Sequence, residues 1–430
     1  MNSTAATEDV PVRIQMTEVG VLPSDWTVVP LISLADKIMV GIASAATHAY
    51  RNVGVVMFRN QNIRPGQLDT EDVLYIAPSY EQSYKNKRLR AGDLLTARTG
   101  YPGTTSLVPE GYEGAQSFTT LITRPRLNAA DPQYLCLYIN GRAGQRYFEQ
   151  AQIGGGQKNV NAASLKQLPV ALPSSEREQR AIATALTDTD ALIGSLEQLL
   201  TKKRQIKQGA MQELLSGRRR LSGFTGAWIS CLWGDVIDEC SSGATPLRSH
   251  PEYYRGSIRW ISSGELNYNV IEETLEHISA EALEKTNLKI HPAGTFLMAI
   301  TGLEAAGTRG ACGIVGMPAA TNQSCMAVYP TSKLLTAYLF HYYVYKGDEL
   351  ALRYCQGTKQ QSYTAALIRV LPIEYPESTD EQLAITQVVS DMDAEITALE
   401  HRLTKARDLK QAMAQALLTG RIRFVEPQAA

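Results

Sequence analysis

The chain has 430 residues, 44% of them hydrophobic, and a formal net charge of −1 at pH 7. This length accommodates two to four domains, and no apolar run approaches the eighteen residues of a membrane-spanning helix. The polar start Met1 to Asp9 lacks a signal-peptide pattern, so we expect a cytoplasmic protein without membrane contact. Near-neutral charge requires that any nucleic-acid contact use locally clustered positive charge or charge supplied by a partner.

Sequence patterns of catalytic and metal sites are missing. The six cysteines form no C-x-x-C pair and have no histidine at zinc spacing, so we expect free thiols and no metal site. The chain has no N-P-P-Y or D-P-P-Y tetrapeptide, no Walker lysine and no H-E-x-x-H. The six histidines are scattered without an evident carboxylate or serine partner. We therefore expect no catalytic residue and no cofactor bound by this chain.

A tail over residues 1–21 precedes a first block of mixed composition. Residues 22–173 combine strand-like runs, Gly/Pro turns and short helices, which predicts one globular domain. Polar and basic residues gather in three places of this block: Arg59, Asn60 and Asn62; Lys85, Lys87, Arg88, Arg98 and Thr99; and Gln157, Lys158 and Asn159. Such residues form either a solvated surface or a set of ligand contacts, and charge alone does not decide between the two.

A long helix is predicted over residues 174–220. Ser174 and Ser175 can cap its first turn, and Gly217 followed by basic residues is typical of a helix end. Its apolar positions have the three-and-four spacing of a helix-packing seam, namely Ile182, Leu186, Ile193, Leu196 and Leu200, with Leu192, Leu199, Ile206 and Leu214 widening the stripe.

Residues 224–376 form a second block that matches the first only at isolated anchors. At an offset of 202, Trp26 corresponds to Trp228 and Gly41 to Gly243. Between the anchors the residues are largely unrelated, as expected of two domains that read different targets. Its candidate contact residues are Ser262, Ser263, Glu265, Lys285, Thr301, Arg309, Lys359, Gln360 and Gln361.

A second long helix is predicted over residues 377–423, and it repeats the first. Aligning residues 178–220 with 381–423 gives 22 identities in 43 positions, which indicates duplication of a domain plus its helix. Its seam comprises Ile385, Val389, Met392, Ile396, Leu399 and Leu403. Each seam needs an apolar partner, so we expect the two helices to pair as an antiparallel coiled coil, a rod of roughly 60 Å. The alternative is that each helix is buried in a separate core.

These elements predict an α+β protein of two globular α/β domains separated by two long antiparallel helices, with internal pseudo-twofold symmetry. The pattern L-P-x-x-x-P, then E-Q-x-x-I, D-x-D and finally K-Q-x-x-x-Q-x-L-L-[ST]-G-x-x-R occurs from Leu168 to Arg220 and again from Leu371 to Arg423. Two ordered copies of it resemble the DNA-specificity subunit of type I restriction-modification systems.

The resemblance implies that each globular domain is a target recognition domain reading one half of an asymmetric, bipartite DNA site. It also implies that two modification (methyltransferase) subunits, and restriction subunits beside them, bind this chain. S-adenosylmethionine, ATP and Mg would then belong to those partners. The resemblance favours double-stranded DNA as the ligand of the residues named in both blocks. The alternative function is a two-domain scaffold that binds proteins rather than DNA.

Overall fold

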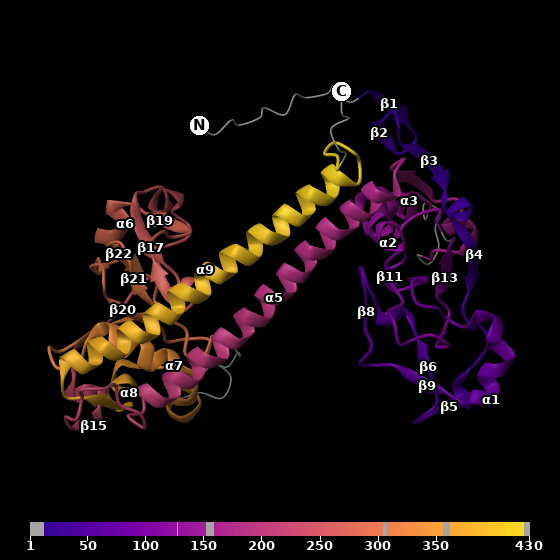
Figure 1. Ribbon diagram of the computed structural model, residues 1–430. Coiled ribbons are helices and arrows are strands. Elements are labelled where there is room, and N and C mark those ends of the chain that lie inside the picture. The colour runs from indigo at the N-terminus through magenta and orange to yellow at the C-terminus, as the bar shows by residue number, and fades with distance from the viewer. Residues whose placement is uncertain (1–12, 127, 152–158, 304–307, 356–361, 425–430) are drawn as a thin grey trace, which may run out of the picture. The chain divides into compact units, whose positions relative to one another are not determined.

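The computed structural model describes residues 13–126, 128–151, 159–303, 308–355 and 362–424. Helices and strands are mixed throughout, in agreement with the mixture of the two that the predicted α+β class implies (Figure 1). The chain divides into a first unit, Met1–Leu196 with Arg402–Ala430, and a second unit, Glu197–His401. Each unit therefore contains one globular block and a part of both long helices.

The first unit contains two four-stranded sheets, ordered β11-β10-β13-β4 and β12-β6-β9-β5, and three two-stranded sheets, β1-β2, β14-β3 and β7-β8. Its strands are β1 (Ile14–Thr17), β2 (Gly20–Pro23), β3 (Thr27–Pro30), β4 (Ala35–Val40), β5 (Tyr50–Arg51), β6 (Val55–Phe58), β7 (Ile63–Arg64), β8 (Gln67–Leu68), β9 (Leu74–Ile76), β10 (Leu94–Thr96), β11 (Thr105–Leu107), β12 (Gln116–Ser117), β13 (Leu121–Pro125) and β14 (Pro169–Leu172). Its helices are α1 (Pro78–Glu81), α2 (Pro132–Asn140), α3 (Arg142–Ala151), α4 (Ala162–Lys166) and the start of α5 (Glu176–Leu214).

The second unit contains a five-stranded sheet, β16-β23-β20-β21-β18, a three-stranded sheet, β19-β17-β22, and the pair β15-β24. Its strands are β15 (Trp228–Leu232), β16 (Ile237–Ser242), β17 (Ile258–Ile261), β18 (Asn269–Ile271), β19 (Glu276–Ile278), β20 (Phe296–Ala299), β21 (Cys312–Val315), β22 (Ala319–Thr321), β23 (Cys325–Pro330) and β24 (Pro372–Pro376). Its helices are α6 (Ala280–Lys285), α7 (Thr336–Tyr354), α8 (Ala365–Arg369) and the start of α9 (Thr379–Leu417).

The glycines shared by the two halves of the chain stand where the backbone allows few other residues. A Cβ atom on Gly41 would collide with the carbonyl group of Ser117, and one on Gly243 would collide with that of Thr321. Gly217 and Gly420 follow the two long helices with φ of +68° and +66°, a left-handed conformation that favours glycine. The helices end at Leu214 and Leu417, so each glycine lies in the turn that follows its helix, and both helices are shorter than the predicted ranges 174–220 and 377–423.

The long helices α5 and α9 run antiparallel where they meet inside each unit. In the first unit Lys410 of α9 pairs with Asp190 of α5 at 2.5 Å, and in the second unit Lys207 of α5 pairs with Asp393 of α9. In the repeat, Asp190 corresponds to Asp393 and Lys207 to Lys410. The two ion pairs are therefore equivalent, with α5 and α9 exchanging the aspartate and the lysine.

The N-terminal part of each long helix also packs into the hydrophobic core of a globular block. Ile182 and Leu186 pack with the buried side chains of α2 and with Leu417, and Ile385 and Val389 pack with Met211 in the corresponding core. Farther along the helices, Leu196, Leu200, Leu399 and Leu403 are buried, whereas Ile193, Met392 and Ile396 are half-buried.

The expectation that Leu192, Leu199 and Ile206 widen the buried stripe is wrong. Their exposed fractions are 49%, 40% and 47%, because these residues flank the seam and one partner helix covers only a narrow face. Leu383 and Leu409 are likewise exposed. The helices therefore carry apolar side chains that their mutual packing leaves uncovered.

Candidate nucleic-acid interface

Three turns of the first unit meet where its strands end, at residues 59–62, 97–100 and 117–120; we call them the first edge. The amide of Phe118 donates to the carbonyl of Phe58 at 2.7 Å, which ties the third turn to β6. The amide of Arg98 donates to Oδ1 of Asn60 at 2.8 Å, and Nδ2 of Asn60 donates to Oγ1 of Thr119 at 3.2 Å. The Asn60 side chain thus connects all three turns.

The second unit builds the same arrangement from the turns at residues 262–265, 299–302 and 321–324, the second edge. The amide of Asn322 donates to the carbonyl of Ile261 at 2.9 Å, and the amide of Ile300 to that of Ser324 at 2.9 Å. Where the first edge has the asparagine link, Oγ1 of Thr245, which lies outside these turns, donates to Oε1 of Gln323 in the third turn. The backbone scaffold is thus repeated while its side chains differ.

Both edges also hold the segment that follows predicted contact residues, Gln157 to Asn159 in the first unit and Lys359 to Gln361 in the second. Val160 donates its amide to the carbonyl of Arg98 at 3.1 Å, and Tyr363 donates to that of Ile300 at 2.9 Å. Asn159, beside Val160, is exposed. The remaining candidates of these tracts, Gln157, Lys158, Lys359, Gln360 and Gln361, lie outside the described residues.

The candidates at the first edge have different roles. Arg98 is half-buried, its Nε lacks a hydrogen bond, and no ion-pair partner is found for it within the described residues; Thr99 beside it is half-buried. Arg59 is held by an ion pair with Asp72 at 3.1 Å. Asn62 is 1% exposed and its Oδ1 accepts the amide of Arg59 at 2.8 Å, so it caps the turn. Arg98 is the candidate whose charge remains available.

At the second edge, Glu265 takes the capping role that Asn62 has in the first. Its carboxylate accepts hydrogen bonds from the amide and the hydroxyl of Ser262, both at 2.8 Å. Ser263 and Thr301 are half-buried, and Thr301 forms an isolated bridge to Ser362. Ile300 stands where the first edge has Arg98 and is only 7% exposed. The two edges therefore offer different chemistry to a ligand.

The predicted basic residues between the turns are partly engaged inside the protein. Nζ of Lys87 donates to the carbonyl of Gly41 at 2.7 Å, which places it beside the first edge. Arg88 forms two hydrogen bonds of 2.7 Å with the buried carboxylate of Glu81, and these bonds lower the pKa of Glu81. Arg309 lies 3.3 Å from Asp348, whereas Lys85 and Lys285 are exposed. The two exposed lysines are thus freer to meet a phosphate than the two arginines.

Within the described part of the chain, no three His, Cys, Asp or Glu side chains gather to hold a metal ion, and no helix is long and apolar enough to cross a membrane. Some histidines do have carboxylate or serine partners that the sequence did not reveal: His250 meets Glu252 at 2.7 Å and His341 meets Ser390 at 3.1 Å. Burial lowers the pKa of His341 to about 4, which makes it a weak base at neutral pH.

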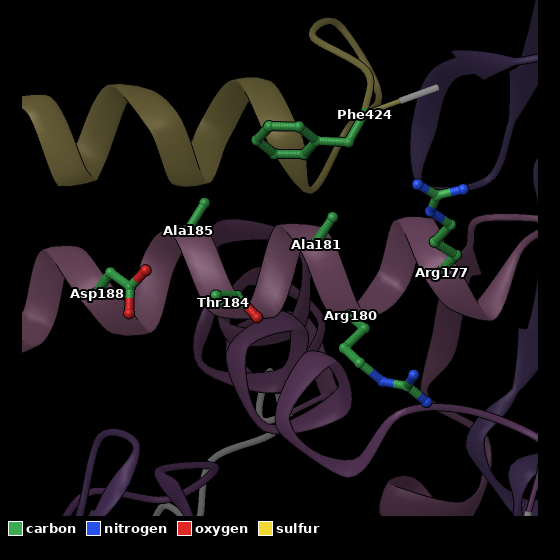
Figure 2. Close-up of a pocket in the computed structure, with 7 residues that line it drawn as sticks. All are labelled: Arg177, Arg180, Ala181, Thr184, Ala185, Asp188 and Phe424. Atoms are coloured by element: carbon green, nitrogen blue, oxygen red, sulfur yellow. The ribbon is translucent and has the colours of Figure 1, made fainter. Parts of the chain in front are cut away.

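Beside the helices, a shallow groove of about 450 Å³ lies where the chain leaves α9. Figure 2 shows the Phe424 ring over Ala181 and Ala185 of α5, with Arg177 and Arg180 on the same helix. The second unit has a groove of about 420 Å³ where Leu221, the counterpart of Phe424 in the repeat, meets Val388. The two grooves thus occupy corresponding places at the ends of the repeated helices.

The comparison with known families decides what this repeated arrangement is. The family model described as the type I restriction modification DNA specificity domain matches residues 23–208 and again residues 231–406. The chain belongs to this family. Each match contains one globular block with most of the long helix that follows it, so the duplication inferred from the sequence corresponds to two copies of the family's domain.

Curated members of the family are similar over parts of their length. The specificity subunit of the MjaX type I restriction enzyme of Methanocaldococcus jannaschii is 29% identical over 216 residues, covering 47% of this chain and 48% of that protein. The EcoR124I/EcoR124II specificity subunit of Escherichia coli is 20% identical over 267 residues, covering 59% and 62%. The alignments thus span about half to three-fifths of these relatives.

Solved structures share the fold at low sequence identity. The S subunit of a type I restriction-modification system from M. genitalium matches with a TM-score of 0.58 and 14% identity, covering 91% of this chain and 96% of that one. A chain from a study of complex assembly and conformational transition in the type I system matches with a TM-score of 0.55 and 17% identity, covering 93% and 99%. The fold is therefore that of the family's S subunits.

Sequence reasoning missed one feature of the family's repeat in this chain and two residues at its edges. Arg220 and Arg423, which follow the two long helices, form ion pairs with the buried carboxylates of Glu381 and Glu178. The sequence shows that the Arg and Glu positions match in the two repeats, but it does not show that they pair with each other. Thr119 and Gln323 at the edges were missed because the residues around them do not align at one constant offset.

Proposed function

We propose that this chain is the specificity subunit of a type I restriction-modification complex, in which each unit reads one half of a bipartite, asymmetric DNA site. The observation that carries the proposal is the pair of edges, built on one backbone scaffold with different side chains. Arg98 and Asn60 in the first unit correspond to Ile300 and Ser263 in the second. Equal scaffolds with unequal side chains suit two readers that meet different base pairs.

The proposal makes the chain itself non-catalytic. Methyl transfer to adenine from S-adenosylmethionine, and DNA translocation and cleavage driven by ATP with Mg, would belong to partner subunits. Two modification subunits would dock on the long helices, where Leu192, Leu199 and Ile206 supply uncovered apolar surface. The complex would act in the cytoplasm, where chromosomal DNA is accessible.

We further propose that α5 and α9 form an antiparallel coiled coil with pseudo-twofold symmetry, which sets the number of unread base pairs between the half-sites. Support comes from the ion pairs Asp190–Lys410 and Asp393–Lys207, which are one contact of the repeat made in each unit. Domain orientation and DNA bending also affect spacing, so the helices limit the spacer rather than fix it alone.

Binding to duplex DNA at several salt concentrations tests the function. The chain assembled with its modification subunits should select one bipartite motif from a randomised duplex library, with an affinity that falls as salt rises. A complex that retains no duplex at any salt concentration would support the protein-binding scaffold instead, an alternative that the family match does not favour.

A further inference from the structure

We infer that Thr119 and Gln323 are specificity-determining residues that occupy equivalent positions in the two edges and each contact bases of one half-site. The inference rests on the proposed function and deepens it by naming the side chains that read. Both residues follow by two positions a residue whose carbonyl group lies close against a glycine. Ser117 lies against Gly41 in this way, and Thr321 against Gly243. Both also lie two positions before a buried strand residue, Leu121 or Cys325.

The backbone at Thr119 is strained for its residue type. Its φ is +54°, in the left-handed region, where a β-branched side chain is rarely found because its Cβ crowds the backbone. Glycine or asparagine would adopt this conformation at lower cost. Strain of this kind is found where the surrounding structure holds a side chain for a function.

The hydroxyl of Thr119 is oriented by its neighbour. Nδ2 of Asn60 donates to Oγ1 of Thr119 at 3.2 Å, while Oδ1 of Asn60 accepts the amide of Arg98 at 2.8 Å. Because Oγ1 acts as acceptor toward Asn60, its own proton is left to donate. Thr119 is half-buried, so that donor can meet a ligand at the surface.

The amide of Gln323 is oriented in a similar way. Oγ1 of Thr245 donates to Oε1 of Gln323, and the Gln323 side chain is exposed. With Oε1 accepting, the two Nε2 protons remain available, and no partner is found for them among the described residues. Each edge therefore presents an outward donor that a second side chain holds in position.

Donors select bases that present acceptors in the major groove. Guanine offers N7 and O6, adenine N7 and thymine O4, whereas cytosine offers only its amino group. We therefore expect a base other than cytosine opposite each residue, and a purine opposite Gln323. Nearby candidates are less suited to reading, because Asn62 and Glu265 use their side-chain oxygens to cap turns.

The test is a selection from a randomised duplex library with the full complex, comparing the parent with Thr119→Val and Gln323→Leu. Valine keeps the branched shape of Thr119 and removes its hydroxyl donor. Leucine keeps much of the length of Gln323 and removes its amide donor. Each variant should lose discrimination by between about 5-fold and 150-fold at one or two adjacent positions of one half-site only. The two variants should affect opposite half-sites, and Ser33→Ala and Ser249→Ala, at exposed positions of the two units, should change neither.

Thr119→Gly separates reading from folding, because glycine relieves the left-handed strain. We expect an unfolding temperature no lower than that of the parent, together with lost discrimination at one half-site. An unchanged motif in these variants, or equal weakening at both half-sites, would overturn the inference while leaving the proposed function intact. Failure of the parent complex to select any motif would overturn the proposed function itself.

Discussion

Arg423 and Glu178 stand 245 positions apart and form a bidentate ion pair, with distances of 2.5 and 2.8 Å. Arg220 and Glu381 repeat it in the second unit at 2.5 and 2.6 Å. In each case an arginine past the end of one long helix reaches a carboxylate in the first turn of the other, and the guanidinium lies over a tryptophan, Trp26 or Trp228. The pair therefore fixes where each helix ends against the other.

Replacing Arg220 with methionine should lower the free energy of unfolding clearly, because the Glu381 side chain is 1% exposed and would lose its ion-pair partner. Urea unfolding followed by circular dichroism measures the effect. Arg218→Met, at an exposed position of the same segment, should change stability by less than about 0.5 kcal/mol. Equal stability of the two variants would show that the buried pair contributes nothing.

The second prediction concerns His341, whose pKa burial lowers to about 4 from 6.5. Because the folded pKa is depressed, the unfolded chain binds the proton more readily, so stability is complete above pH 6.5 and falls as pH decreases toward 4. At pH 5 the loss should be about 2 kcal/mol relative to pH 7. Urea midpoints measured from pH 7 to 5 should decrease in the parent.

The control for this prediction comes from the repeat itself. His341 lies on α7, and the corresponding position of α2 in the first unit is Leu137. His341→Leu therefore introduces the side chain that the equivalent helix already carries. This variant should remove that part of the pH dependence. A slope between pH 7 and 5 identical to that of the parent would assign the titration to other groups.

A third prediction separates the covered and uncovered faces of α5. Leu199 is 40% exposed and Leu196 is 6% exposed. Leu199→Glu should leave the unfolding temperature nearly unchanged and weaken binding of modification subunits at least tenfold, as a charge in an apolar interface would. Titration calorimetry measures the binding, and Leu352→Glu, at an exposed position of α7, is the matched control. Unaltered affinity would place the docking surface elsewhere.

The sequence allowed several of these elements to be predicted because local chemistry determines them. Gly217 and Gly420 mark helix ends since few other residues adopt their φ, and the three-and-four spacing located the helices before any partner was known. The covered width of the seam could not be predicted, as Leu192 and Ile206 show, because it depends on how many helices pack there. Pairs such as Arg423 and Glu178 join residues that are distant in the sequence, and the spacing of residues within one helix does not indicate them.

The same limit applies to the edges. Asn62 and Glu265 were predicted to contact DNA on residue type, yet both cap turns through their side-chain oxygens, and this role depends on the turn's geometry. Arg98 differs from them because no hydrogen bond or ion pair within the described residues engages its Nε. Residue type indicates what a side chain can bind, whereas its neighbours decide whether it remains available.

A fourth prediction uses that availability. Arg98→Leu should weaken binding to the selected duplex by about 1–3 kcal/mol and affect the half-site of the first unit, since a guanidinium at the edge can contact guanine or phosphate. Fluorescence anisotropy with duplexes mutated in either half-site measures this. Arg126→Leu, whose side chain is 55% exposed and follows the end of β13 that is opposite to residues 117–120, serves as the control. An equal loss for both variants would indicate general charge attraction only.

The central claim is that this chain confers one split DNA sequence on a methyltransferase complex, and sequencing methylated adenines in the host tests it most directly. Deleting the gene should abolish methylation at a single bipartite, asymmetric motif, and restoring it with Gln323→Leu should relax only one half of that motif. An adenine methylation pattern unchanged by the deletion would contradict the account.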